Sequence, residues 1–318
     1  MVTEELLEHQ DSMRTKVIAV FQALLVTVFW SSSFVIIKVG LSEIPPLTFA
    51  ALRYSIGAII LLAIIFAQSE MRDALRNRSS RWWGLLFIYG CVYITVAQGT
   101  QFLGLLYLPA ITFSLIMNMT PLLVLILAIP LIRETPSMKE TFFVILGIIG
   151  VLIYFFPLDF IGVSIIGLVI ALVSLFANTI SSILGRAANR KRDTPPLVVT
   201  GVMMTVGAVF LLILSLMVEP IQPLSLVSWF YILWLATINT ALAFTLWSRS
   251  QRVLRAIDMA LINSTMMPQI VILSIIFLGE MPESLDWVGL GILAFSVAAV
   301  QYLQAKRGEK RITNNQKG

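Results

Sequence analysis

The sequence predicts an all-α membrane protein with ten transmembrane helices in two inverted five-helix repeats. Hydrophobic residues make up 58% of the chain and charged residues 12%, whereas a soluble domain has about a quarter of its residues charged. The apolar residues occur in blocks of about 20, the length that a helix needs to cross roughly 30 Å of hydrocarbon. The polar connections alternate in charge, and the second half of the chain repeats landmarks of the first.

The apolar blocks predict ten spans that are joined mostly by short polar connections. A five-span repeat over residues 16–156 follows a tail at 1–15, and a second repeat over 161–304 precedes a basic tail at 305–318. The spans are 16–37, 47–67, 82–103, 109–131, 138–156, 161–185, 197–217, 227–248, 257–278 and 285–303.

The charge pattern predicts which side of the membrane each connection faces. The two tails and alternate connections carry basic residues such as Arg72, Arg133 and Arg255. The opposite connections, 42–46, 104–108, 157–160, 218–226 and 279–286, contain no lysine or arginine. Basic connections mark the cytoplasmic side, so we expect a multi-pass protein of the cell membrane with both termini in the cytoplasm. The formal charge of +5 then follows from topology, and nucleic-acid binding is not needed to explain it.

Several function classes lack the residues that they require. Cys91 is the single cysteine and His9 the single histidine, so an internal disulfide, a multi-cysteine metal site and a histidine-based triad at membrane depth are excluded. We expect no metal and no cofactor. Residues 1–11 are acidic and polar, so no removable signal peptide is expected.

An internal repeat appears when the two halves are aligned in order. The match is weak at single positions, but its order is kept along the half-chain. It pairs Pro46 with Pro196, Gly57 with Gly207, Trp82 with Trp229, Pro121 with Pro268, Glu134 with Glu280 and Pro136 with Pro282. Because five is an odd number of crossings, the second copy enters from the opposite side, the architecture that is associated with alternating access.

Two spans, 109–131 and 257–278, contain an internal proline, Pro121 and Pro268. A proline leaves the carbonyl four residues earlier without its amide partner, here that of Met117 and of Ser264. In lipid such a carbonyl needs another donor, so both breaks should face protein or water. Two interrupted spans at matching positions predict a binding site near the membrane midplane, with the prolines as hinges.

Both halves of the chain carry short motifs. The first repeat carries the residues 29–34 (FWSSSF), then Lys38, the pair Pro45 and Pro46, and 50–54 (AALRY); the second carries the Pro268 span and 279–280 (GE). In these motifs the chain resembles the EamA family of the drug/metabolite transporter superfamily. The resemblance covers nearly the whole chain. It implies ten helices in two inverted repeats, cytoplasmic termini and, usually, export of metabolites or amino acids.

Two basic residues lie inside or near the ends of spans. Arg53, nearly two turns inside its span, should face the protein interior because a charge in lipid is costly. It either holds a substrate carboxylate or braces helices, through backbone carbonyls or a loop acid such as Glu43. Lys38 is near a helix end, where it can extend to the interface.

Other polar and aromatic side chains are candidates for the wall of a solute pocket. Trp30 and the serines that follow it, Ser32 among them, could line that pocket, but small hydroxyl residues also let membrane helices approach closely. Membrane-depth amides need partners, which a pocket or a neighbouring helix supplies; Tyr93 either packs with Tyr89 or stacks on a solute. The full set of candidates is Trp30, Ser32, Arg53, Tyr93, Gln98, Asn118, Asn178, Asn239 and Asn263.

No carboxylate lies at the middle of a span. Glu140, Asp258 and Asp286 each lie within about a turn of a span's start, and Glu134 and Glu280 lie at helix ends. The small multidrug transporters of the same superfamily carry a glutamate in their first span, and this chain has none there. Proton coupling through a central carboxylate is therefore not supported.

The sequence favours a secondary transporter that exports small metabolites such as amino acids by alternating access. Its partners are a small-molecule solute and the lipid bilayer. The alternative is a passive facilitator or channel for small polar solutes. A membrane enzyme fits less well, because no convergent acids, metal cluster or nucleophile with a base is visible at membrane depth.

Overall fold

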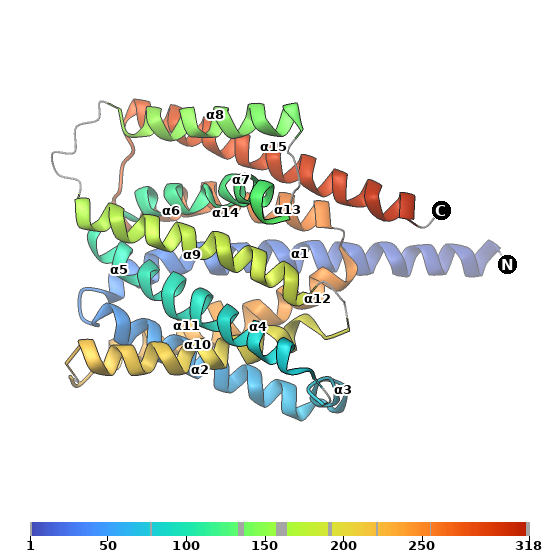
Figure 1. Ribbon diagram of the computed structural model, residues 1–318, viewed down its shortest axis with the longest axis horizontal. Helices are drawn as coiled ribbons and strands as arrows, with labels where there is room; N and C mark the ends of the chain where they lie inside the picture. The colour runs from blue at the N-terminus through green and yellow to red at the C-terminus, as the bar shows by residue number, and fades with distance from the viewer. Residues whose placement is uncertain are drawn as a thin grey trace.

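The computed structural model describes residues 2–76, 78–132, 137–156, 164–189, 193–220, 222–254 and 256–315. All regular structure in these ranges is helical (Figure 1). The first half contains α1 (Val2–Gly40), α2 (Pro46–Ala67), α3 (Ser69–Asp73), α4 (Ser80–Gly90), η1 (Cys91–Gln98), α5 (Gly99–Tyr107), α6 (Ala110–Asn118), α7 (Thr120–Ile132) and α8 (Met138–Tyr154). The second contains α9 (Ile165–Asn189), α10 (Pro196–Val218), α11 (Leu226–Ala236), η2 (Thr237–Leu242), α12 (Ala243–Val253), α13 (Ala256–Ser264), α14 (Met266–Leu278) and α15 (Ser284–Asn315).

The prediction of a ten-helix membrane protein is confirmed. Within the described ranges, nine helical stretches are long and apolar enough to cross a membrane. The tenth predicted span, 138–156, corresponds to α8, an apolar helix of 17 residues. The terminal helices extend beyond the predicted spans, because α1 starts at Val2 and α15 continues to Asn315. Figure 1 places the start of α1 and the end of α15 on the same side of the bundle.

The two halves repeat the same series of elements. The helices α4 and α11 each have 11 residues, α6 and α13 each have 9, and α7 and α14 each have 13. Both α2 and α10 begin at the second residue of a Pro-Pro pair, with φ of −57° at Pro45 and at Pro195. Proline suits a first helical position because its missing N–H would have no partner there. The predicted pairs Glu134 with Glu280 and Pro136 with Pro282 each include one residue outside the described ranges.

The repeats are interlocked rather than placed side by side. The first helix of one repeat, α1, packs on α12, α13 and α14 of the other, and α9 packs on α5, α6 and α7 in the same way. The related helices α8 and α15 pack along each other at one edge of the bundle, and α2 and α10 do so at the opposite edge (Figure 1). Most of the interior is therefore contact between repeats.

Glycines allow the closest of these contacts. A Cβ on Gly207 of α10 would lie 2.3 Å from the carbonyl oxygen of Gly90, and one on Gly57 of α2 would lie 2.8 Å from the Thr240 side chain. In α15, a Cβ on Gly289 would lie 2.6 Å from the carbonyl oxygen of Gly150 in α8. Small residues let membrane helices approach closely, so the predicted pair Gly57 and Gly207 marks equivalent crossings in the two repeats.

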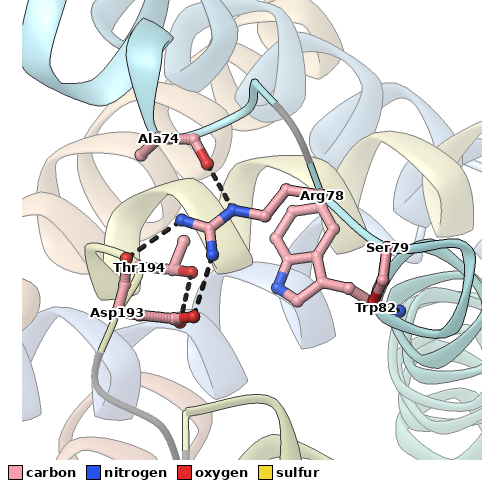
Figure 2. A network of polar contacts seen from close by, with 6 residues as sticks. All are labelled: Ala74, Arg78, Ser79, Trp82, Asp193 and Thr194. Atoms are coloured by element: carbon pink, nitrogen blue, oxygen red, sulfur yellow. Dashed lines mark hydrogen bonds and ion pairs between the residues drawn. The ribbon is translucent and has the colours of Figure 1, made fainter.

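Opposite sides of the molecule carry different contacts between the repeats. Figure 2 shows Arg78, just before α4, donating to the Asp193 carboxylate and to the Asp193 carbonyl oxygen just before α10. At the other side, Glu43 accepts hydrogen bonds from the hydroxyls of Ser225 and Ser228 at the start of α11. An acid that precedes the second long helix of each repeat thus contacts residues at the start of a helix in the other.

Candidate functional site

Both proline-containing spans are interrupted, as predicted. The first is divided into α6 and α7 at Met119 and the second into α13 and α14 at Thr265, and both residues have φ of −72° and ψ of −12°. Each amide donates to the carbonyl three residues earlier over 3.1 Å, so the last turn before each break is tightened. The breaks precede Pro121 by two residues and Pro268 by three, so the elements correspond more closely than the prolines do.

Local side chains pair with backbone groups at the first break. The hydroxyl of Thr120 donates to the carbonyl of Met117 over 2.7 Å, and this carbonyl is the one that Pro121 deprives of its amide. Pro121 is half-buried. The first break is therefore satisfied within its own span.

The second break is held by the first helix of the other repeat. Gln269 donates to the hydroxyls of Thr27 and Thr265, each over 3.1 Å, and accepts from Ser31 over 3.0 Å. Ser31 also lies 3.2 Å from the carbonyl oxygen of Met266, next to the break. We did not single out Gln269 from the sequence, although its place one residue after Pro268 was a usable signal.

Pro268 itself is exposed, on the helix face that carries Ile272, 55% exposed, and Ile276, 66% exposed. Residues four apart share a helix face, so these three side chains form one exposed apolar face of α14. Thr265, at the break itself, is half-buried and bonded to Gln269, so the interruption is turned inward although the proline is not.

Two π-helical segments, η1 and η2, lie at equivalent places in the two repeats. They contain three of the candidate residues, Tyr93, Gln98 and Asn239. Short π-helical segments are rare and often occur at functional sites. Neither segment contains a proline or glycine, so the sequence offered no local signal for it.

Arg53 lies where α2 meets η2. It is 4% exposed, and its Nε donates to the hydroxyl of Thr240 over 3.0 Å. The guanidinium carbon lies 5.0 Å from the centre of the Tyr54 ring and 5.9 Å from that of Phe102. The Tyr54 hydroxyl donates to Gln98 over 2.7 Å. Arg53, Gln98 and the two rings therefore form one cluster between the repeats.

Asn239, the residue before Thr240, connects this cluster to α1. Its amide donates to the hydroxyls of Ser32 and Ser33, each over 3.0 Å, and to the carbonyl of Phe29. Its Oδ1 is buried without a partner in the described chain. Ser32, Arg53, Gln98 and Asn239 thus belong to one continuous polar path through α1, η2, α2 and η1.

Trp30 lies beside this path in an aromatic group. Its ring centre is 5.5 Å from that of Phe244 and 5.0 Å from that of Trp247. Tyr93 stacks on Tyr89 with ring centres 5.8 Å apart. Aromatic packing within the protein thus accounts for the surroundings of both residues.

The remaining amides lie apart from this path. Asn178 donates to the carbonyl of Ser174 over 2.9 Å and to the sulfur of Met117 over 3.7 Å. Asn118 donates to the carbonyl of its own helix at Ser114 over 2.8 Å. Asn263 is half-buried, and its side chain makes no hydrogen bond within the described residues. The candidates thus form one central cluster and separate positions on α9, α6 and α13.

Lys38 and the loop acids have structural partners. Lys38 donates to the carbonyls of Leu105 and Leu108 at the end of α5, over 2.6 and 2.7 Å. Glu280 accepts from the amides of Ala110 and Ile111 at the start of α6, over 2.7 and 2.9 Å. Carboxylates are stabilised at helix N-termini, where amides are unpaired.

Glu219, another acid of the connections that lack lysine and arginine, plays the same part at the start of α2. It accepts from the amides of Leu47 and Thr48, over 2.8 and 2.7 Å. Glu43, which the sequence suggested as a brace for Arg53, is bonded to Ser225 instead. We call Glu43, Glu219 and Glu280 the acidic clamp, because each joins one repeat to the other on the side whose connections lack lysine and arginine.

Comparison with known proteins identifies the family. Residues 17–156 and 165–302 match the EamA-like transporter family. The chain is 28% identical over 218 residues to the uncharacterized transporter YvbV of Bacillus subtilis (strain 168), covering 68% of this chain and 66% of YvbV. It is 24% identical over 230 residues to the uncharacterized transporter YoaV of the same organism, covering 70% of this chain and 75% of YoaV.

An uncharacterized transporter of Methanothermobacter thermautotrophicus is 28% identical over 205 residues, covering 60% of this chain and 59% of that protein. A crystal structure with 17% sequence identity shares the fold, with a TM-score of 0.64 over 91% of this chain and 98% of that one. The family match includes both interrupted spans, both π-helical segments and all nine candidate residues. This chain therefore belongs to the EamA-like transporter family and is a multi-pass membrane transporter.

Proposed function

We propose that the protein is a secondary transporter of the cell membrane that exports small metabolites such as amino acids by alternating access. Both termini lie in the cytoplasm, on the side to which the basic connections belong. The solute site lies between the repeats near the membrane midplane, along the path from Ser32 through Asn239 to Arg53 and Gln98. Trp30, Tyr93, Asn118, Asn178 and Asn263 form its outer wall.

One observation carries this proposal: both repeats contain the same pair of irregular elements, a broken span and a π-helical segment, and the polar cluster spans η1 and η2. Irregular backbone at membrane depth is tolerated where it is buried in protein or lines a water-filled cavity. Interrupted helices at matching positions also mark the binding sites of transporters built from inverted repeats. The breaks at Met119 and Thr265 provide the points about which the repeats bend.

The first experiment asks which solutes the protein moves. Metabolites in the medium are compared, without preselection, between cells that lack and cells that overproduce the protein. We expect one class of small metabolite to accumulate outside overproducing cells. The identified solute is then tested in proteoliposomes, where unlabelled solute on the far side should accelerate labelled efflux. Equal efflux with and without it would favour the passive facilitator instead.

The hinge part of the proposal is tested in the same proteoliposomes. Pro121→Ala and Pro268→Ala should both lower flux while leaving the protein inserted, because alanine lets the span regain a regular helix. Wild-type flux in both variants would rule out the prolines as hinges.

A further inference from the structure

Arg53 carries a charge that nothing in the described chain neutralises. Its side chain is 4% exposed, and its one hydrogen bond there goes to the neutral hydroxyl of Thr240. No ion pair joins it to an acid in the described ranges. A buried charge is retained at membrane depth only at a cost unless it is paired or hydrated.

Two acids lie near the start of α2, the helix that carries Arg53, and both are already engaged. Glu43 is bonded to Ser225 and Ser228, and Glu219 to Leu47 and Thr48. Lys38, near the end of α1, differs from Arg53 because two backbone carbonyls accept from it. The bracing role that fits Lys38 therefore does not account for Arg53.

The free part of the guanidinium is the part that recognises oxyanions. Its two terminal nitrogens make no hydrogen bond within the described residues, so their N–H donors are unused inside the bundle. A guanidinium presents parallel N–H groups that match the two oxygens of a carboxylate. The hydrogen bond to Thr240 and the rings of Tyr54 and Phe102 hold this fork in position.

We propose that Arg53 binds the carboxylate of the transported solute, so that the protein selects small organic acids and zwitterions with a free carboxylate. This inference rests on the proposed function and narrows its substrate class. Arg53 lies where α2 of the first repeat meets η2 of the second. A bound carboxylate therefore sits at a contact that changes when the repeats move.

Binding is tested first on the purified full-length protein in detergent. Acetate, butyrate and phenylacetate are each compared with the neutral amide of the same acid at equal ionic strength. The midpoint temperature of thermal unfolding is measured by tryptophan fluorescence. The variants are Arg53→Gln and Arg53→Lys. Arg78→Gln is the matched control, because it removes a guanidinium at the bundle surface that is paired with Asp193.

We expect at least one carboxylate, and not its amide, to raise the midpoint of the wild type and of Arg78→Gln. The apparent affinity should fall about tenfold or more in Arg53→Gln, because charge-assisted hydrogen bonds are lost. The apparent affinity of Arg53→Lys should lie between those of the wild type and Arg53→Gln, since lysine keeps the positive charge but lacks the parallel N–H groups of a guanidinium. If Arg53→Gln does not fold, Arg53→Lys and the acid–amide comparison on the wild type decide. Equal effects of acid and amide, no effect of any carboxylate, or unchanged affinity in the folded Arg53 variants would each overturn the proposal.

Transport separates this inference from the proposed function. If the solutes that overproducing cells release carry carboxylates, and Arg53→Gln stops their release, both stand. If the released solutes lack a carboxylate, the transporter stands and the role of Arg53 is overturned. If no solute is released although carboxylates bind at Arg53, the proposed export function fails and the binding site stands.

Discussion

Arg53 and Lys38 show how surroundings decide what a basic residue does inside a membrane protein. Lys38 reaches the open carbonyl end of α5, where a cation is stabilised by unpaired backbone oxygens. Arg53 has a single neutral acceptor and a free fork. Both residues could be selected from the sequence as intramembrane cations. Their different roles could not be predicted from the sequence, because each role depends on which groups of another helix lie next to the residue.

Backbone contact at Gly207 gives the first prediction. In Gly207→Ala, the added methyl group would lie 2.3 Å from the Gly90 carbonyl oxygen and 2.5 Å from the Cβ of Ile94. Because these neighbours belong to a packed helix, overpacking should cost about 1–3 kcal/mol and lower the unfolding midpoint in detergent. Gly84→Ala is the control, since no atom lies within 4 Å of its added methyl group. Equal midpoints for the two variants would contradict the packing argument.

Asp193 gives a pH-dependent prediction. The Thr194 hydroxyl donates to its carboxylate, and the guanidinium of Arg78 adds to this effect (Figure 2), so the pKa of Asp193 lies below its ordinary value. A lowered folded-state pKa stabilises the protein above the unfolded pKa, and this contribution is lost as pH falls through the folded pKa. The pair is exposed, so the effect should be small.

A comparison of wild type with Asp193→Asn tests whether stability changes with pH in the expected direction. Wild type should have the higher unfolding midpoint at neutral pH, and the difference should shrink as the solution becomes strongly acidic. A difference that stays constant down to the most acidic condition would show that the carboxylate's charge is not its source.

At the scale of elements, the prolines predicted that two spans are broken but not how the breaks are supported. Pro121 frees the Met117 carbonyl, which the next residues satisfy locally. Pro268 lies on an exposed apolar face, and the polar contacts at its break come from Gln269 and α1. The π-helical segments could not be predicted, because their residues fit an ordinary helix; η1 packs against α10 and η2 against α2, both helices of the other repeat.

The support at the second break predicts that Gln269 is needed for transport. Gln269→Leu removes the partner of Thr27, Ser31 and Thr265. Each of these hydroxyls keeps a backbone acceptor but loses a hydrogen bond that contributes about 0.5–1.5 kcal/mol, so flux in proteoliposomes should fall several-fold and the unfolding midpoint should drop. Gln101→Leu is the control, because the Gln101 side chain in α5 makes no hydrogen bond in the described chain. Equal flux in both variants would show that the break does not depend on this contact.

At the scale of the whole molecule, the repeat could be detected from a few landmark pairs, and the structure shows why these survive. Pro46 and Pro196 start equivalent helices, and Gly57 and Gly207 lie at equivalent crossings. Each repeat packs mainly against its partner rather than against itself. The packing of α1 and α9 on helices of the other repeat could not be predicted, since sequence spacing does not indicate which helices contact each other.

The acidic clamp holds the interlocked repeats together on one side. Glu219 and Glu280 belong to the second repeat and bond the starts of α2 and α6 in the first. Glu43 belongs to the first and bonds residues at the start of α11 in the second. Any movement that separates the repeats on this side must break these contacts, so alternating access requires that the clamp can be released.

Weakening the clamp should therefore shift the protein toward a form that is open on that side. A neutral amide accepts hydrogen bonds from helix amides less strongly than a carboxylate, and 1.4 kcal/mol corresponds to a tenfold change in population. With Cys91 replaced by serine, a cysteine at the buried position Ser114 of α6 should react several-fold faster with a membrane-impermeant maleimide in Glu280→Gln than in the parent. The reagent is added from outside, so the same labelling also tests the proposed orientation.

Glu283→Gln is the control, because it changes an exposed acid three residues away from Glu280, and it should leave the labelling rate unchanged. Equal labelling rates for Glu280→Gln and Glu283→Gln would mean that Glu280 does not hold the repeats closed.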